Sequence, residues 1–172
     1  MIVEMGHRLM AFGIDCPLAQ YTSHDVHRES LPMQGEPFGA TRRAFVEVLH
    51  RLGGHPQRAL IGGTLGPSTN HLLEVELRVS EDLPLGAATT CPGAFGRDLV
   101  PGLAEEFIEW IPAALMTRFA RPGVITIDRA AYDEVESSVL SFSLAADLLA
   151  LVLSHQSLPE AEGAIRQRLT EW

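Results

Sequence analysis

The sequence predicts an α+β fold in which helices pack on one face of a small β-sheet. Two patterns carry this prediction. Leucine and valine alternate with polar residues over residues 72–80, the period of a half-buried strand. Over residues 138–153, Leu140, Leu144, Leu148 and Val152 recur four positions apart, which predicts a buried helix. The chain has 172 residues, 46% hydrophobic and 20% charged, a composition typical of one globular domain.

The first 59 residues predict little regular structure. Residues 2–3 and 9–12 are short apolar runs typical of strands. Prolines and glycines between residues 13 and 39 predict turns and loop. From Thr41, which can cap a helix, we expect a helix that ends at residues 53–54. Its predicted apolar stripe consists of Phe45, Val48, Leu49 and Leu52.

The middle of the chain predicts a strand, a loop, a helix and a second strand. The strand at residues 72–80 is expected to end in a turn at 81–86, before a weaker extended segment at 87–91. Pro101 is expected to open a helix that continues to Leu115 and is kinked at Pro112. The breaker at residues 122–123 then precedes a strand over residues 124–127.

Two helices are predicted at the end of the chain. Ser137 or Ser138 can cap the first, because a hydroxyl accepts a hydrogen bond from a free N–H of the first helical turn. Ser157 and Glu160 have the spacing of a capping box, which predicts that the second helix begins there. We expect its apolar stripe to pack on the core and the terminal Trp172 to be available to a partner.

The first of these helices and the residues before it also resemble a known family. Residues 132–146 read YDEVESSVLSFSLAA. This run resembles domain IV of elongation factor G, the bacterial translocation GTPase, where the pattern is Tyr-His-acidic-Val-Asp-Ser-Ser-x-Leu-x-Phe-x-Leu-Ala-Ala, without a gap over about fifteen positions. The departures are Asp133 for the family's histidine, Glu136 for its aspartate and Val139 for its usual glutamate.

The resemblance extends over residues 60–153. Residues 62–66 and the strand after His71 are similar to the family's glycine-rich tip loop and its following strand, and residues 100–102 to its Ile-Pro-Gly helix start. The resemblance implies the ribosomal protein S5 domain 2-like fold, with a left-handed strand–helix–strand crossover. It divides the chain into an N-terminal region, residues 1–59, and a domain IV-like part, residues 60–172.

The resemblance also implies a binding tip made of two loops. In the family these loops enter the ribosomal decoding centre and contact messenger and transfer RNA. The residues of this chain at the corresponding positions are Gly62, Gly63, Asn70, His71, Tyr132, Asp133 and Glu136.

The charge of the chain disfavours direct binding to nucleic acid. The net charge is −9, and all thirteen basic residues are arginine, so lysine is absent. An acidic protein is repelled by phosphate unless its basic residues gather on one face. A phosphate-binding loop of the GTPase type needs a lysine, so the chain has none. No cofactor is expected, and no apolar run is long enough to cross a membrane, so a cytoplasmic protein is expected.

An alternative interpretation places a site in the N-terminal region. His24 and His27 are three residues apart and Cys16 lies upstream, so their side-chain types match a metal site. Cys16 with a nearby histidine also matches a nucleophile–base pair. Solvated histidines and a packed, reduced cysteine explain the same residues, and we favour that interpretation.

Three functional hypotheses follow. The first is a non-enzymatic, stand-alone relative of elongation factor G domain IV that binds the ribosome or a translation factor. The second is a small-molecule-binding protein or enzyme that shares only the fold, with a site in the N-terminal region. The third is a homo-oligomer built through the C-terminal helix, without a site of its own.

Overall fold

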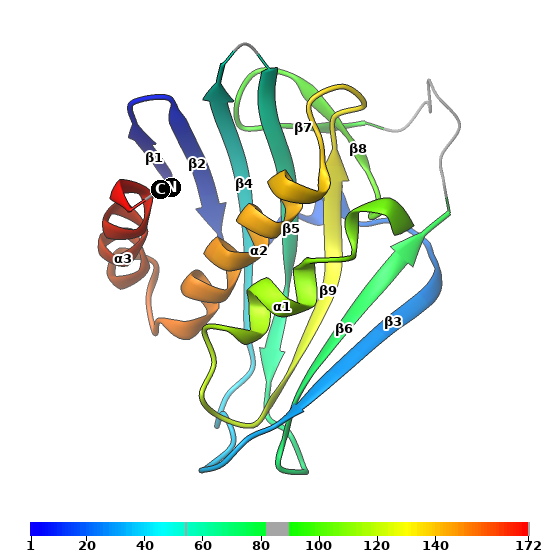
Figure 1. Cartoon of the computed structure of the whole chain (residues 1–172), viewed down its shortest axis with the longest axis vertical. Helices are drawn as coiled ribbons and strands as arrows, with labels where there is room; N and C mark the ends of the chain where they lie inside the picture. The colour runs from blue at the N-terminus through cyan, green and yellow to red at the C-terminus, as the bar shows by residue number, and fades with distance from the viewer. Residues whose placement is uncertain (54, 82–89, 172) are drawn as a thin grey trace.

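The computed structural model describes residues 1–53, 55–81 and 90–171, and it has an α+β fold (Figure 1). Its strands are β1 (Ile2–Met5), β2 (Arg8–Gly13), β3 (Ser23–Pro32), β4 (Arg42–Leu52), β5 (His55–Gly66), β6 (Leu72–Ser80), β7 (Cys91–Pro92), β8 (Asp98–Pro101) and β9 (Gly123–Tyr132). Its helices are α1 (Ile111–Met116), α2 (Val139–Ser154) and α3 (Leu158–Thr170), with short 3-10 turns η1 (Pro17–Ala19) and η2 (Glu105–Phe107). Among the described residues no helix is long and apolar enough to cross a membrane.

Strands from the predicted N-terminal region and from the domain IV-like part form one sheet, in the order β1-β2-β4-β5-β9-β6-β3. The boundary expected at residue 59 therefore falls inside β5. Strand β9 is central, because it pairs antiparallel with β5 and parallel with β6. Seen from the helix side with β6 and β9 both pointing up, β9 lies to the left of β6 and α1 lies in front of the sheet (Figure 1). The β6–α1–β9 connection is therefore left-handed, the rare hand for such a crossover.

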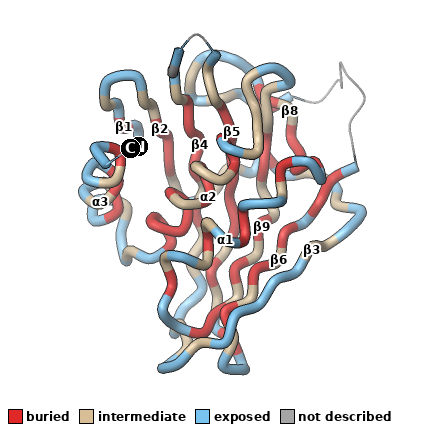
Figure 2. The backbone as a smooth tube through the Cα atoms, in the orientation of Figure 1, coloured by how far each residue is buried: buried red, intermediate tan, exposed pale blue. Residues whose placement is uncertain are grey.

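The main core lies between the sheet and the helices. Alternate residues of the central strands are buried, and the buried faces of the three helices close over them (Figure 2). Helix α3 buries Ala161, Ile165 and Leu169 against its own chain, so its predicted apolar stripe lies in this core. Leu140 is an exception to the stripe predicted for α2. Its side chain is 58% exposed, because it lies on the less buried face of α2 with Ser143, Leu144 and Asp147, whereas Phe142 of the same turn is fully buried.

A smaller core lies on the opposite face of the sheet. Its fully or nearly fully buried residues come from η1, β5, β7, β8 and β9, and they are Ala19, Leu60, Cys91, Leu99 and Ala131. Leu60 and Ala131 face away from the helices because their strand neighbours, Ala59 and Ala130, belong to the main core.

The helix predicted from Thr41 was wrong. Residues 42–52 form β4, which pairs along its whole length with β5 and over residues 45–50 with β2. Ala44, Val46 and Val48 alternate toward the helices, so a period of two describes this segment as well as the helical stripe did. Two flanking strands satisfy the backbone groups of β4, and this decides the conformation. The loop predicted before it was also wrong in part, because residues 23–32 form the edge strand β3.

The glycine-rich tip loop predicted at residues 62–66 is also a strand. Gly62 and Gly63 lie inside β5, at a register shift opposite β9. A Cβ atom at Gly63 would overlap the backbone carbonyl oxygen of Thr126, so the backbones of β5 and β9 approach closely here. The glycines therefore serve strand packing and leave no loop at this position.

The helix predicted from Pro101 was wrong at its start. Pro101 ends β8, and Gly102 has a φ of +152°, so the chain changes direction between β8 and η2. The helix itself begins at Ile111, with Pro112 in its first turn, where a missing N–H costs nothing.

The other predicted elements are confirmed in kind. The strands at residues 2–3, 9–12, 72–80 and 124–127 and the two C-terminal helices are present, with small differences in their ends. Of the predicted turn at 81–86 and extended segment at 87–91, residues 82–89 lie outside the described residues, as does Trp172; Cys91 belongs to β7.

Replacement of Gly63 with alanine should destabilise the chain by at least about 2 kcal/mol, because the new Cβ atom meets backbone that cannot move alone. Gly66→Ala is the control in the same strand, since its Cβ atom would make only an ordinary contact with Thr41. It should stay within about 1 kcal/mol of the parent. Urea unfolding measures both, and equal stabilities of the two variants would contradict the close approach.

The two predicted helix caps should differ in strength. The Ser138 hydroxyl accepts from the Ser141 N–H at 3.1 Å, whereas Ser157 makes no side-chain capping hydrogen bond. Ser138→Ala should therefore cost about 1 kcal/mol of unfolding free energy and Ser157→Ala only a few tenths. Chemical unfolding of both variants checks this, and a larger loss for Ser157→Ala would reverse the assignment.

Candidate functional site

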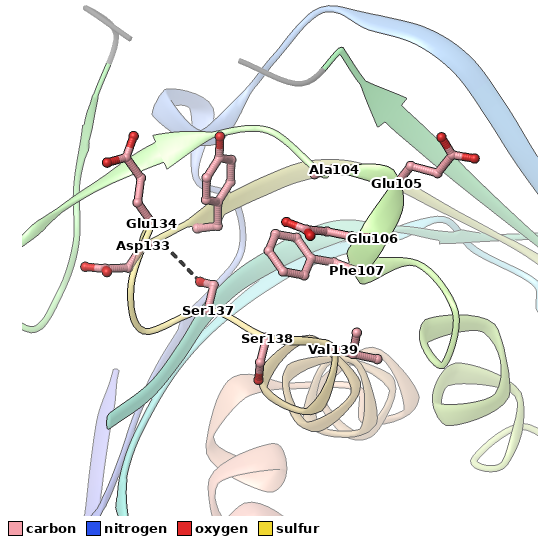
Figure 3. Close-up of a pocket in the computed structure, with 10 residues that line it drawn as sticks. Ala104, Glu105, Glu106, Phe107, Asp133, Glu134, Ser137, Ser138 and Val139 are labelled. Atoms are coloured by element: carbon pink, nitrogen blue, oxygen red, sulfur yellow. Dashed lines mark hydrogen bonds between the residues drawn. The ribbon is translucent and has the colours of Figure 1, made fainter. Parts of the chain in front are cut away.

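A hollow in the described surface lies at the end of β9, between η2 and the start of α2 (Figure 3). Its volume is about 770 Å³. Two segments form its walls, residues 104–107 on one side and residues 132–139 on the other. We call it the η2–α2 hollow. Ten residues line it: Ala104, Glu105, Glu106, Phe107, Tyr132, Asp133, Glu134, Ser137, Ser138 and Val139.

Hydrogen bonds define the shape of the second wall. The Asp133 carboxylate accepts from the N–H groups of Val135 and Glu136, at 2.9 and 3.0 Å. The Asp133 N–H in turn donates to the Ser137 hydroxyl at 2.9 Å (Figure 3). Asp133 thus holds a tight turn between β9 and α2, the kind of turn that aspartate side chains favour.

The first wall is attached to the sheet through the residues before η2. The Gly102 N–H donates to the Ala130 carbonyl of β9 at 2.9 Å. The Leu103 N–H donates to the Ser80 hydroxyl, and its carbonyl accepts from the Ser80 N–H, both at 3.0 Å. Strands β6 and β9 therefore determine where η2 lies.

Aromatic rings lie between the two walls. The Phe107 ring stacks on Phe142 of α2 with centroids 4.8 Å apart, and it lies 5.8 Å from the ring of Tyr132. Phe107 is buried and belongs to the main core, so this part of the hollow is lined by a core side chain.

The hollow is acidic. Four of its ten lining residues are carboxylates, and none is arginine or histidine. Glu106 points across the hollow toward the second wall, while Glu105 points outward on the other side of η2 and Asp133 and Glu134 lie at the rim (Figure 3). Glu136, which the resemblance places at the tip, is held away from the hollow by Arg97 at 2.9 Å.

Arg58 of β5 anchors the second wall from below. Its backbone N–H donates to the Glu136 carbonyl at 2.8 Å, and its carbonyl accepts from the Ser137 hydroxyl at 2.6 Å. The neighbouring Gln57 side chain accepts from the Ser138 hydroxyl. The wall that resembles the family thus depends on residues that the sequence placed in the N-terminal region.

The Arg58 side chain also holds the β7–β8 hairpin. It forms an ion pair with Glu47 at 2.7 Å, with each side chain only 1% exposed, and donates to the Arg97 carbonyl at 2.8 Å. The second oxygen of Glu47 accepts from the Ala94 N–H at 2.7 Å. Each charge of the pair therefore has further hydrogen-bond partners, as buried charges require.

The two predicted tip loops do not meet. Asn70 and His71 belong to the turn between β5 and β6, beside the start of β9, because Gly66 pairs with Val124. Asp133 follows the other end of the same ten-residue strand. The prediction of a single tip built from both loops was therefore wrong, since Gly62 and Gly63 lie within β5 between these ends.

The N-terminal metal candidates are also dispersed. His27 pairs with Glu29 on β3 at 3.2 Å, and Cys16 packs against the smaller core. Burial raises the pKa of the Cys16 thiol, which disfavours the thiolate that a ligand or nucleophile needs. Within residues 1–53, 55–81 and 90–171, no three histidine, cysteine, aspartate or glutamate side chains form a group that could hold a metal ion.

Sequence reasoning missed Glu105, Glu106 and Arg58 as site residues. The strand–helix pattern around η2 carries no signal for the two glutamates, because their position depends on the break at Gly102. Phe107 falls within the helix predicted from Pro101 to Leu115, but it belongs to η2.

Comparison with known proteins identified no match: neither the family models, the curated proteins nor the solved structures include one.

Replacement of Arg58 with methionine should cost about 3–5 kcal/mol of unfolding free energy, because it leaves the Glu47 carboxylate buried without its partner. The double variant Glu47→Leu/Arg58→Met removes both charges and should recover a large part of this loss. Arg51→Met, at an exposed position of the neighbouring strand, is the control and should stay within about 0.5 kcal/mol. A loss below about 1 kcal/mol for Arg58→Met would contradict the anchoring role.

Proposed function

We propose that this chain is a non-enzymatic binding protein of the cytoplasm, a stand-alone relative of elongation factor G domain IV that binds the ribosome or a translation factor. Its binding surface is the η2–α2 hollow. The 172 residues lack the lysine that a phosphate loop of the GTPase type needs.

The topology supports this proposal. The S5 domain 2-like fold, which the resemblance implies, contains a left-handed strand–helix–strand crossover. The β6–α1–β9 connection has that hand, and β9 leads directly into the segment that resembles the family signature. Left-handed crossovers are rare, so their presence beside the signature is an informative coincidence.

The observation that carries the proposal is the composition of the hollow. Its walls are residues 104–107 and 132–139, which lie in or directly after the segments on which the resemblance is based. Val135, in the turn of the second wall, is 86% exposed. A concave surface on which polar side chains from separate segments converge is a usual place for a binding site.

The small-molecule alternative has less support. Cys16 packs on the face opposite the helices, while His24 and His27 lie on the edge strand β3. Nothing brings the three together. For a homo-oligomer through α3, only the polar face of that helix is available, because its apolar stripe packs against α2 and β1.

Co-sedimentation with bacterial ribosomes tests the proposal. At low salt the purified chain should pellet with ribosomes and remain in the supernatant without them. Val135→Ser should reduce the bound fraction, with an affinity loss of about fivefold, because it removes an exposed apolar side chain from the turn of the second wall. Ile2→Ser is the matched control, since Ile2 is 60% exposed on the distant strand β1.

No association at low or moderate salt would refute the ribosomal proposal. Association that Val135→Ser and Ile2→Ser weaken equally would show that another surface binds.

A further inference from the structure

We propose that the η2–α2 hollow receives a basic, amphipathic segment of a partner protein. An arginine or lysine of the segment lies in the hollow, and an apolar side chain next to it packs on the rim. This inference rests on the proposed function, because it assumes that the hollow is the binding surface, and it specifies the chemistry of the partner.

The rim provides the apolar part of the surface. By the rim we mean Val135 and Leu140, which are 86% and 58% exposed. In sequence they lie four residues before and one residue after Val139, which lines the hollow. All three belong to the turn before α2 or to its first helical turn, where backbone N–H groups donate to the Asp133 and Ser138 side chains and define the backbone. Such a fixed surface loses little conformational entropy when a partner binds.

The interior suits a cationic side chain. A volume of about 770 Å³ lies within the range of ligand pockets and accommodates a few side chains. Glu106 points into this space, where the Phe107 and Tyr132 rings lie side by side. A guanidinium or ammonium group would face a carboxylate and aromatic rings, both of which attract cations.

The α2 N-terminus contributes an opposing charge. Its partial positive charge, about half an elementary charge, would weaken binding of a cation. The Ser138 and Ser141 side chains already satisfy part of this terminus. The full negative charge of Glu106, which points into the hollow, is about twice this partial charge, so the field beside Glu106 is negative.

The same field excludes other classes of partner. Phosphate groups of RNA or of an acidic membrane would be repelled by the wall carboxylates and by a net charge of −9. At a ribosome, the chain would therefore contact a protein segment rather than RNA through this surface.

A direct binding measurement tests the inference. The probe is a fluorescein-labelled synthetic peptide of alternating arginine and leucine, titrated with the full chain and followed by anisotropy. The peptide should bind at low salt, more weakly as salt rises. A second peptide with glutamate in place of arginine should not bind, and a third with serine in place of leucine should bind several-fold less tightly.

Paired variants locate the binding. Glu105→Gln/Glu106→Gln should lower the affinity of the chain for the arginine–leucine peptide about tenfold. Glu4→Gln/Glu36→Gln changes the net charge by the same amount at exposed positions outside the hollow. This pair should lower the affinity for the same peptide less than about twofold. Equal weakening by both pairs, or no binding of the basic peptide, would overturn the inference.

The peptide and ribosome experiments fail separately. If the chain pellets with ribosomes and Val135→Ser reduces this, but the basic peptide does not bind, the binding surface stands and the partner chemistry is wrong. If the chain does not pellet but binds the peptide through Glu105 and Glu106, the hollow is a basic-peptide site outside the ribosome.

Discussion

The buried ion pair between Arg58 and Glu47 is the interaction on which the candidate site depends. The two charges lie on adjacent strands, almost without solvent, on the face of the sheet opposite the helices. Their side chains hold the β7–β8 hairpin through Ala94 and Arg97, while the backbone of Arg58 holds Glu136 and Ser137. Because an unpaired buried charge is very costly, all of these contacts must form together.

The central strand β9 positions both walls of the hollow. It is held from both sides by β5 and β6, and close approach at Gly63 brings its backbone against β5. The chain that leaves β9 forms one wall of the hollow, and the chain that leaves β8, which pairs with the end of β9, forms the other. Strands β8 and β9 therefore hold both walls in place, while Val135 and the glutamates of η2 face solvent.

The sequence predicted the elements whose periodicity allows only one interpretation. Strand β6 alternates strictly, and α2 has both a capping serine and a long apolar stripe. Strand β4 fits two periods, since Phe45, Val48 and Leu49 suggest a helix while Ala44, Val46 and Val48 suggest a strand. Only its pairing with β2 and β5 decides between them, and this is a tertiary effect.

The site was predictable in one wall only. The run from Tyr132 to Val139 is recognisable because its turn and cap use local hydrogen bonds between residues close in sequence. Glu106 and Arg58 reach the same place through long-range pairing, which leaves no local pattern. The loop predicted at Gly62 and Gly63 was wrong for a related reason. Glycine occurs in loops, but it also occurs where two strands approach closely.

The most direct test of the central claim, that the η2–α2 hollow is the binding surface, is amide hydrogen exchange of the full chain with and without saturating bacterial ribosomes. Binding at the hollow predicts slowed exchange at residues 104–107 and 133–140, with residues 91–99 and 158–170 unchanged. Slowed exchange confined to the β7–β8 hairpin, α3 or the edge strand β3 would contradict the claim.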